Sequence, residues 1–390
     1  MLFKNKRGIL VGAFAVAFAI CGTGNVIHAS ANSKATSSNS PYLVGIVLPE
    51  TGSSAASGTD MFNAAKLAVK KINSSGGILK HPVQLVEEDD ACDPQTAVNA
   101  ANKVVSLNVQ AVIDGYCSGA VLPSLPIYNR AGIPVVDPAA NSSALVQQGD
   151  HNLFVVNSLG NDQARTAAQF MVKVLHAKKI ALLNDQSAYG ENLTSLTKAQ
   201  LQNLRQSVAD YEGVPATLQD FSSLIYKYKS EHIDAIYWTG YYAQGGLLIK
   251  QARQLGYKGA IMVADGSVDN VLISTAGNRY ANGVYATMSP MPPFLRGVQA
   301  TDFTKAYTSA YHTQPGPYSA LTYDSLMVLQ QSAKNAHSID PAKVINALHA
   351  VHYTGITGPI SFAANGARKN ARFLVLEVKN GKFTLAPTQP

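Results

Sequence analysis

Apolar and amphipathic segments alternate along most of the chain, and this alternation predicts the fold. Residues 42–48 form an apolar run rich in β-branched side chains, and apolar residues in 61–72 then recur at helical spacing. The same order of strand and helix continues with apolar runs at 83–88, 111–114 and 133–136. Strands this apolar are typical of a parallel sheet that is covered by helices on both faces.

The pattern restarts near Asn157 and predicts a second sheet. Helices are expected at 162–175, 191–204, 221–230 and 244–255, and strands at 180–184, 209–213, 235–238 and 261–264. Two rounds of one pattern predict an α/β protein with two Rossmann-like lobes and parallel central sheets. The remaining elements are too few for a third domain, so we expect them to complete the two lobes, with more than one crossing between lobes. They are helices at 303–311, 318–336 and 341–351 and a hairpin around Asn380.

Polar loops follow the predicted strands and indicate where a ligand would bind. In open α/β sheets, ligands bind at the carboxyl edge of the strands. Two such sheets therefore predict a cleft between their carboxyl edges. The loops expected to line it are 51–59, 116–119, 138–143, 185–191, 240–244 and 264–268.

The N-terminus has the features of a secretory signal peptide. Basic residues at 4, 6 and 7 precede an uncharged apolar run at 9–20, and small residues at 29–31 offer a cleavage site near Ala31. A retained membrane anchor is the alternative, but the apolar run is short for a span of about 20 residues. A lipoprotein based on Cys21 is disfavoured by the bulky Ile20. We predict a signal peptide at 1–31, a flexible segment at 32–41 and a periplasmic location.

The net charge does not indicate a nucleic-acid partner. The formal charge is +7, and the three basic residues of the signal peptide lower it to +4 when they are removed. A modest positive charge without a lysine or arginine block gives no basic patch of the kind that binds nucleic acid.

Two cysteines remain after signal-peptide cleavage, Cys92 and Cys117. An even number in an exported protein predicts one disulfide. If the strands at 83–88 and 111–114 are neighbours in a parallel sheet, both cysteines lie at its carboxyl edge. A reactive thiol or a metal site is the alternative, but the sequence has no CxxC or HxxxH spacing.

A few polar and aromatic residues at strand ends could contact a ligand. Ser118 precedes a predicted helix, and its hydroxyl with the free N–H groups of that helix could bind an anion, although an ordinary helix cap is the simpler interpretation. Tyr189, Tyr241 and Tyr242 follow strands and could form pocket walls or pack in the core. Asp265 could meet an ammonium group or could be a turn residue before Gly266. The sequence has no GxSxG, GxxxxGK[ST] or GxGxxG motif.

Taken together, these segments resemble the solute-binding proteins of branched-chain amino-acid ABC importers, the leucine/isoleucine/valine-binding type of type I periplasmic binding protein. The markers, in matching order and spacing, are 68–78, 89–94, 117–118, 189–191 and 240–242. The resemblance extends from about Tyr42 to the C-terminus. It implies two α/β lobes that are joined by three crossovers and close on an amino acid. The lobes are then expected at 42–157 with 288–362, and at 158–287 with 363–390.

The resemblance also implies roles for the polar residues at the strand ends. Ser118 would bind the ligand carboxylate through its hydroxyl and N–H. Asp265 would pair with the ammonium group, where the family usually has the longer Glu. Asn141 stands where the family uses Thr or Ser to contact both groups, and the Ala139 carbonyl would accept from the ammonium.

The walls of the implied pocket depart from the family pattern at one position. Tyr189 and Tyr241 would form walls. Ser57 occupies a position that is often aromatic in the amino-acid binders, so a larger or more polar ligand could fit there. The resemblance therefore implies an amino-acid ligand without implying leucine.

We expect an extracytoplasmic binding protein that captures an amino acid or a similar small solute and delivers it to a membrane ABC permease. It is expected to be a monomer without catalytic residues, metal or cofactor and without a nucleic-acid partner. One alternative is a ligand-sensing protein for a signalling receptor, which would use the same lobes. Another is a secreted amidase or hydrolase, which the missing nucleophile–base pair disfavours.

Overall fold

The structure is a computed structural model and describes residues 40–390 of the chain. The predicted signal peptide at 1–31 lies outside the described residues, as does most of the predicted flexible segment at 32–41. Two large sheets organise the described part, one with five strands and one with seven. The predicted α/β class with parallel central sheets is confirmed.

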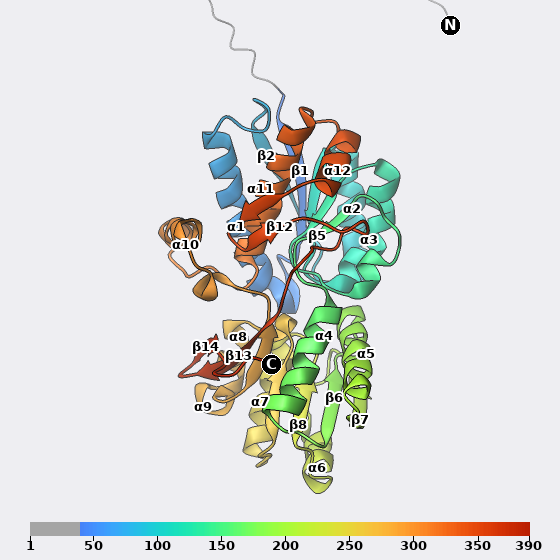
Figure 1. Cartoon of the computed structure of the whole chain (residues 1–390), viewed down its shortest axis with the longest axis vertical. Coiled ribbons are helices and arrows are strands. Elements are labelled where there is room, and N and C mark those ends of the chain that lie inside the picture. Colours follow the sequence, from blue (N-terminus) through green and yellow to red (C-terminus); the bar gives the residue numbers. More distant parts are fainter. Residues whose placement is uncertain (1–39) are drawn as a thin grey trace, which may run out of the picture. The chain divides into compact units, whose positions relative to one another are not determined.

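The five-stranded sheet is parallel throughout, in the order β2-β1-β3-β4-β5. Its strands are β1 (Tyr42–Leu48), β2 (Val83–Asp89), β3 (Ala111–Asp114), β4 (Val135–Asp137) and β5 (Leu153–Val155). The helices around it are α1 (Ala55–Ser74), α2 (Pro94–Ser106), α3 (Ser118–Ala131), α11 (Ser319–Ala336) and α12 (Pro341–His349) (Figure 1).

Alternation along β1 explains why helices cover both faces of this sheet. Val44 and Ile46 pack in one cluster with apolar residues of α1 and α11, whereas Val47 packs in another with residues of α2 and α3. Successive side chains of a strand point to opposite faces, so a strand that is apolar at nearly every position is buried on both sides.

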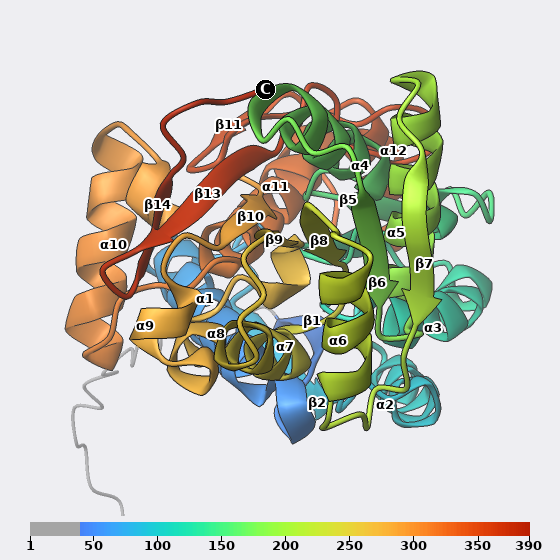
Figure 2. The same cartoon turned by 90° about the horizontal axis from the view of Figure 1, so that it is seen from below.

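The seven-stranded sheet has the order β14-β13-β10-β9-β8-β6-β7 (Figure 2). Its strands are β6 (Ile180–Asn184), β7 (Val208–Gly213), β8 (Ala235–Trp238), β9 (Ala260–Val263), β10 (Tyr285–Met288), β13 (Leu374–Lys379) and β14 (Lys382–Leu385). The first five are parallel, and the predicted C-terminal hairpin adds β13 and β14 antiparallel to the edge.

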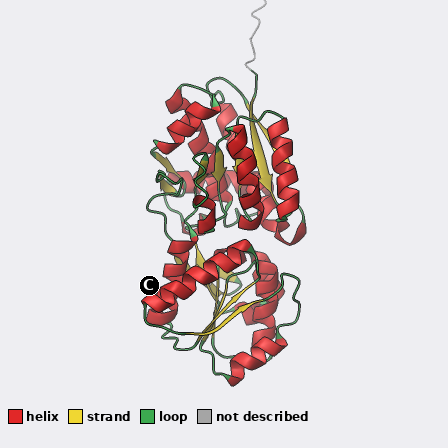
Figure 3. Cartoon of the chain, turned by 90° about the vertical axis from the view of Figure 1, so that its right-hand side faces the viewer, coloured by secondary structure: helices red, strands yellow, loops and turns green. Residues whose placement is uncertain are grey.

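Helices cover both faces of this second sheet as well (Figure 3). Leu182 and Tyr237 share a cluster with apolar residues of α4 and α5, whereas Ile236 and Trp238 pack in the cluster that holds apolar residues of α7 and α8. The helices are α4 (Gly160–Gln169), α5 (Ala188–Asn203), α6 (Ser222–Ser230), α7 (Tyr242–Gln254), α8 (Asn270–Ala276) and α9 (Asn278–Ala281).

The chain passes between the two sheets three times: after β5, after β10 and before β13. On the second passage it forms α10 (Val298–Tyr311), which contacts α1, then α11, α12 and the pair β11 (Tyr353–Gly355) and β12 (Gly358–Ile360). The exact lobe boundaries stay a prediction. None of the described helices is both long and apolar enough to cross a membrane.

The expected loop at 51–59 is wrong, because a short 3₁₀-helix at Gly52–Ser54 leads directly into α1 at Ala55. The glycine that suggested a loop has a packing role instead. A Cβ on Gly58 would lie 1.7 Å from the carbonyl oxygen of Pro49. Gly58 therefore lets the first turn of α1 approach the end of β1.

The predicted Cys92–Cys117 disulfide is confirmed, with the two Cα atoms 5.4 Å apart. The assumption that its two strands are neighbours is wrong, because β1 lies between β2 and β3. The bond closes nevertheless because both cysteines lie beyond the strand ends. Cys92 reaches across from the loop after β2, where it has a left-handed backbone with φ of 56°.

Candidate ligand-binding site

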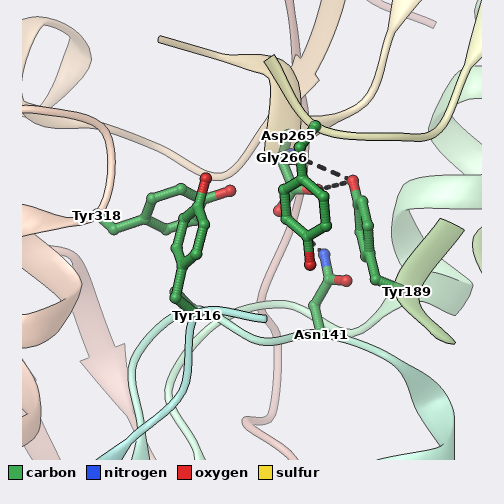
Figure 4. A pocket seen from close by; sticks show the side chains of 8 residues that line it. Tyr116, Asn141, Tyr189, Asp265, Gly266 and Tyr318 are labelled. Atoms are coloured by element: carbon green, nitrogen blue, oxygen red, sulfur yellow. Dashed lines mark hydrogen bonds between the residues drawn. The ribbon is translucent and has the colours of Figure 1, made fainter. Parts of the chain in front are cut away.

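The carboxyl ends of strands from both sheets meet around one small cavity. Its wall is formed by Tyr116, Ala139, Asn141, Tyr189, Tyr241, Asp265, Gly266 and Tyr318 (Figure 4). All of these except Tyr318 follow β3, β4, β6, β8 or β9, and Tyr318 directly precedes α11. The predicted cleft between the two carboxyl edges is thus present as a cavity. About 190 Å³ of space, counted together with the open solvent at its mouth, is not filled by protein atoms.

Asp265 is the centre of the hydrogen bonds at this cavity. Its Oδ1 accepts from the Tyr189 hydroxyl at 2.6 Å and from Gln163 Nε2 at 2.9 Å. Its Oδ2 accepts from Asn141 Nδ2 at 3.0 Å. Tyr189 and Gln163 belong to helices of the seven-stranded sheet, whereas Asn141 follows β4 of the five-stranded one. The Asp265 carboxylate therefore joins the two halves.

The Asp265 carboxylate is buried without a basic side chain beside it. It is 2% exposed, and none of the eight residues that line the cavity is basic. Burial raises its pKa above the ordinary value, and the hydrogen bonds from Tyr189, Gln163, Tyr318 and Asn141 oppose that rise. The Asp265 carboxylate therefore has no cationic partner among the residues that line the cavity.

Asn141 and Ala139 place two further acceptors beside Asp265. Asn141 donates its amide hydrogens to Asp265 and to Gln163, which leaves the buried Oδ1 of Asn141 without a hydrogen-bond partner. The Ala139 carbonyl accepts from Asn157 Nδ2 at 2.7 Å and keeps a second lone pair. An ammonium group has three N–H donors, and this corner of the cavity offers three acceptors.

Tyrosine rings form the rest of the wall. The Tyr116 ring packs edge-on against Tyr318 with centroids 5.5 Å apart, and Tyr241 lies 5.8 Å from Tyr116 and 5.4 Å from Tyr189. Figure 4 shows Tyr116 and Tyr318 at one side of the cavity and Asn141 and Tyr189 at the other. Burial raises the pKa of all four phenols, so they remain neutral.

Ser118 lies at the start of α3 and does not line the cavity. It is buried, and its Oγ accepts from the backbone N–H of Ser142 at 3.2 Å. No side chain caps this end of α3, so its first N–H groups are not satisfied by a cap. The proposed contact of Ser118 with a ligand carboxylate stays a prediction.

Ser57 also lies behind the wall and not in it. It belongs to the first turn of α1, and its Oγ donates to the Tyr116 hydroxyl at 3.1 Å. Asp269 Oδ2 lies 3.5 Å from the same Ser57 Oγ. Ser57 therefore contacts a wall residue without lining the cavity itself.

Gln163, Tyr116 and Tyr318 take part in this arrangement but were not among the predicted ligand-binding residues. Tyr116 lay in a predicted cleft loop, and Tyr318 began a predicted helix. Gln163 had a recognisable signal, because it is a polar residue on the buried face of α4, next to Ala164 and Ala167. Its buried amide bonds Asp265 and the Thr287 hydroxyl.

The described residues contain no group of three or more His, Cys, Asp or Glu side chains that could hold a metal ion. The chemistry of the cavity is instead that of a binding site, with acceptors at one corner and neutral phenols around them.

Comparison with known proteins identifies the family. A sequence model of the family described as "Periplasmic binding protein" matches residues 41–382. The chain is 30% identical over 348 residues to an amino acid binding protein of Pseudomonas aeruginosa, covering 88% of this chain and 92% of the relative. It is 32% identical over 335 residues to the Leu/Ile/Val-binding protein of Escherichia coli K12, covering 86% and 90%.

Solved structures give the same result. The leucine-binding protein LivK of Thermotoga maritima has a TM-score of 0.83 and 28% identity, with 89% of this chain and 98% of that chain covered. The substrate-binding protein LivJ of Streptococcus pneumoniae, in complex with isoleucine, has a TM-score of 0.83 and 26% identity, with 90% and 100% covered. The chain therefore belongs to the periplasmic binding protein family, whose members are binding proteins and not enzymes.

Proposed function

We propose that this protein binds a single amino acid in the cavity around Asp265 and is the substrate-binding component of an ABC importer. The observation that carries the proposal is the buried Asp265 carboxylate, which has hydrogen-bond donors from both halves and no basic side chain in the surrounding wall. A ligand ammonium is the cation that would complete it, with Asn141 Oδ1 and the Ala139 carbonyl as further acceptors.

The rest of the amino acid would extend from this corner. Its carboxylate would meet Ser118 and the N-terminus of α3, where free N–H groups and the helix dipole favour an anion. Tyr189 and Tyr241 would form walls. A ligand that contacts residues around both sheets stabilises the closed arrangement over an open one, and this difference drives closure.

The predicted signal peptide and the family support an extracytoplasmic, periplasmic site of action. There the protein would act as a monomer and deliver its amino acid to a membrane permease, without a cofactor or a nucleic-acid partner. A ligand-sensing role would use the same cavity. Radiolabelled uptake by cells with and without the gene separates the two roles, because only transport predicts that uptake is lost.

The identity of the ligand is tested by a thermal-shift screen of the L-amino acids, followed by calorimetry of those that raise the melting temperature.

The Asp265→Asn variant keeps the size of the side chain but loses its charge. We expect it to weaken binding by about 30- to 100-fold, or roughly 2–3 kcal/mol, since hydrogen bonds between charged groups are worth this much. Asp340→Asn, at the cap of α12, is the control and should bind as the wild type does. Equal affinity of Asp265→Asn and wild type would remove Asp265 from the site.

A further inference from the structure

The peptide unit that joins Ala139 and Ala140 is held at both of its polar groups. Its N–H, from Ala140, donates to Asp137 Oδ1 at 2.9 Å, and its carbonyl, from Ala139, accepts from Asn157 Nδ2 at 2.7 Å. Asp137 and Asn157 are both buried. Ala139 and Ala140 lie outside helices and strands. Because a peptide unit is planar, these two bonds set the direction in which the Ala139 carbonyl points.

Strand register explains why Asn157 reaches this peptide unit. β4 and β5 are parallel neighbours, and Asp137 pairs with Val155 at their carboxyl ends. Two residues further along the chain from each of these, Ala139 and Asn157 leave the sheet at the same edge. Asn157 lies in the first passage between the two sheets, after β5 and before α4. The cavity wall at Ala139 is therefore supported by a segment that connects the two halves of the protein.

The hydrogen-bond partners of Asn157 fix the orientation of its amide group. Its Oδ1 accepts from the backbone N–H of Ser158 at 2.8 Å and from the Ser289 hydroxyl at 2.5 Å. A backbone N–H can only donate and a backbone carbonyl can only accept. Oδ1 must therefore face Ser158, and Nδ2 must face the Ala139 carbonyl, since the flipped amide would lose both bonds.

Ser289 links this arrangement to the second passage of the chain. It is buried and directly follows β10. Two residues earlier, the Thr287 hydroxyl accepts from Gln163 Nε2, which also donates to Asp265 Oδ1. One end of β10 thus bonds the group that holds the Ala139 carbonyl and the group that holds the Asp265 carboxylate. These are two of the three acceptors assigned to the ligand ammonium.

We infer that Asn157 is a positioning residue for amino-acid binding, which fixes the Ala139 carbonyl as an acceptor for the ligand ammonium. This inference rests on the proposed function. A buried ammonium needs acceptors for three N–H donors, and an acceptor that is already held in position need not be ordered when the ligand binds. Asn157 does not line the cavity, so its effect on the ligand passes through Ala139.

Two probes that differ only at the ammonium group test the inference. They are the tightest-binding L-amino acid of the thermal-shift screen and the corresponding L-2-hydroxy acid, compared by competition calorimetry. A hydroxyl has one donor, which Asp265 can accept, so binding of the hydroxy acid depends little on Ala139. The wild type should prefer the amino acid by at least about a hundredfold. Equal binding of the two probes, or binding of no amino acid, would contradict the proposed function and with it the inference.

Asn157→Ala and Asn152→Ala separate positioning from a general contribution to stability. Each removes a buried amide that donates to a backbone carbonyl. Asn152 bonds Ile133 and directly precedes β5, at the opposite edge of the same sheet. Both variants should unfold more easily, but only Asn157→Ala should lower the preference for the amino acid, by about fivefold or more. A preference as high as that of the wild type, even with weaker binding of both probes, would overturn the inference and leave the proposed function intact.

Ser289→Ala keeps the inference testable if Asn157→Ala does not fold. It removes one of the two donors that orient the Asn157 amide, so the preference should fall by a smaller factor, about twofold. Ser325→Ala is the matched control, because Ser325 is buried in α11 and its Oγ bonds the Leu321 carbonyl. Equal preferences in Ser289→Ala and the wild type would then overturn the positioning role of Asn157.

Discussion

At the scale of single residues, Asp265 combines deep burial with donors that reach it from both halves of the protein. Tyr189 and Gln163 approach it from helices of one sheet, and Asn141 from a loop of the other. A buried carboxylate is costly unless hydrogen bonds and a cation compensate for the lost hydration. The donors supply the first requirement, and the ammonium of an amino acid would supply the second.

Ser118 gives a separate test at this scale, for the other end of the ligand. Ser118→Ala should weaken amino-acid binding by about 1–3 kcal/mol, because it removes a bond to a charged carboxylate. Ser124→Ala is a matched control, since Ser124 is buried in the same helix and its Oγ bonds only the Ala120 carbonyl. Calorimetry that finds both variants equal to wild type would exclude a contact between Ser118 and the ligand.

The sequence could predict much of this site because most of its residues directly follow strands. Asn141, Tyr189 and Asp265 lie just beyond β4, β6 and β9, so strand assignment alone places them at the carboxyl edges of the two sheets. Gln163 and Tyr318 could not be found in this way. Gln163 lies on α4 and Tyr318 directly precedes α11, and only the packing of those helices on the sheets brings the two residues to Asp265.

At the scale of elements, three buried carboxylates lie at the ends of neighbouring strands: Asp114 and Asp137 end β3 and β4, and Asp90 directly follows β2. These carboxylates accept hydrogen bonds from backbone N–H groups and from the Tyr128 hydroxyl. Burial raises the pKa of all three, that of Asp90 to about 6, and repulsion between neighbouring carboxylates adds to the rise. These groups make the stability of the fold depend on pH.

The sign of that dependence follows from proton binding. The folded protein holds protons on these groups at pH values where unfolded aspartates, with pKa near 3.9, have released them. The stability that Asp90 contributes is therefore complete below about pH 4 and is lost as the pH rises through about 6, and that of Asp114 and Asp137 is lost as the pH rises through their own raised pKa values. Urea unfolding at several pH values should show a free energy of unfolding that falls from pH 4 to pH 7.

Two neighbouring variants separate Asp90 from the general effect of pH. Asp90→Asn should show a shallower fall, whereas Asp93→Asn should keep it, because hydrogen bonds from Thr96 lower the pKa of the exposed Asp93 and place its titration below this range. A free energy of unfolding that rises with pH over the interval, or the same slope in Asp90→Asn and wild type, would contradict this account.

The disulfide is the second prediction at this scale. Replacing Cys92 and Cys117 together by serine should lower the free energy of unfolding by about 3 kcal/mol, because the unfolded chain regains the freedom of the closed loop. Denaturant unfolding measures this loss, and a reductant should lower wild-type stability but leave the double variant unchanged. Equal stability of wild type and variant would contradict a structural role for the bond.

Element order was predictable from hydrophobic periodicity, whereas strand order and short elements were not. The position of β1 between β2 and β3 depends on pairing between distant segments, which a local pattern does not encode. Elements such as β5 and β11 have three residues each, too few to establish a period. The helix start at Ala55 was hidden because Gly58 and its serine neighbours are typical of loops.

At the scale of the whole molecule, two repeats of one folding pattern create a site that neither contains alone. Asp265 stands beyond β9 of one sheet and Asn141 beyond β4 of the other, and their bond spans the cavity edge. The division into two lobes was predictable from the repeat of strand and helix. The size and polarity of the cavity were not, because they depend on how the tyrosine side chains pack together.

The central claim is that this cavity binds an amino acid through its ammonium group. Calorimetry with the tightest-binding L-amino acid and with its N-acetyl derivative tests it most directly, since acetylation removes the positive charge and keeps the side chain and carboxylate. The account predicts micromolar or tighter binding of the free amino acid and at least hundredfold weaker binding of the derivative. Equal binding of the two, or binding of no amino acid, would contradict it.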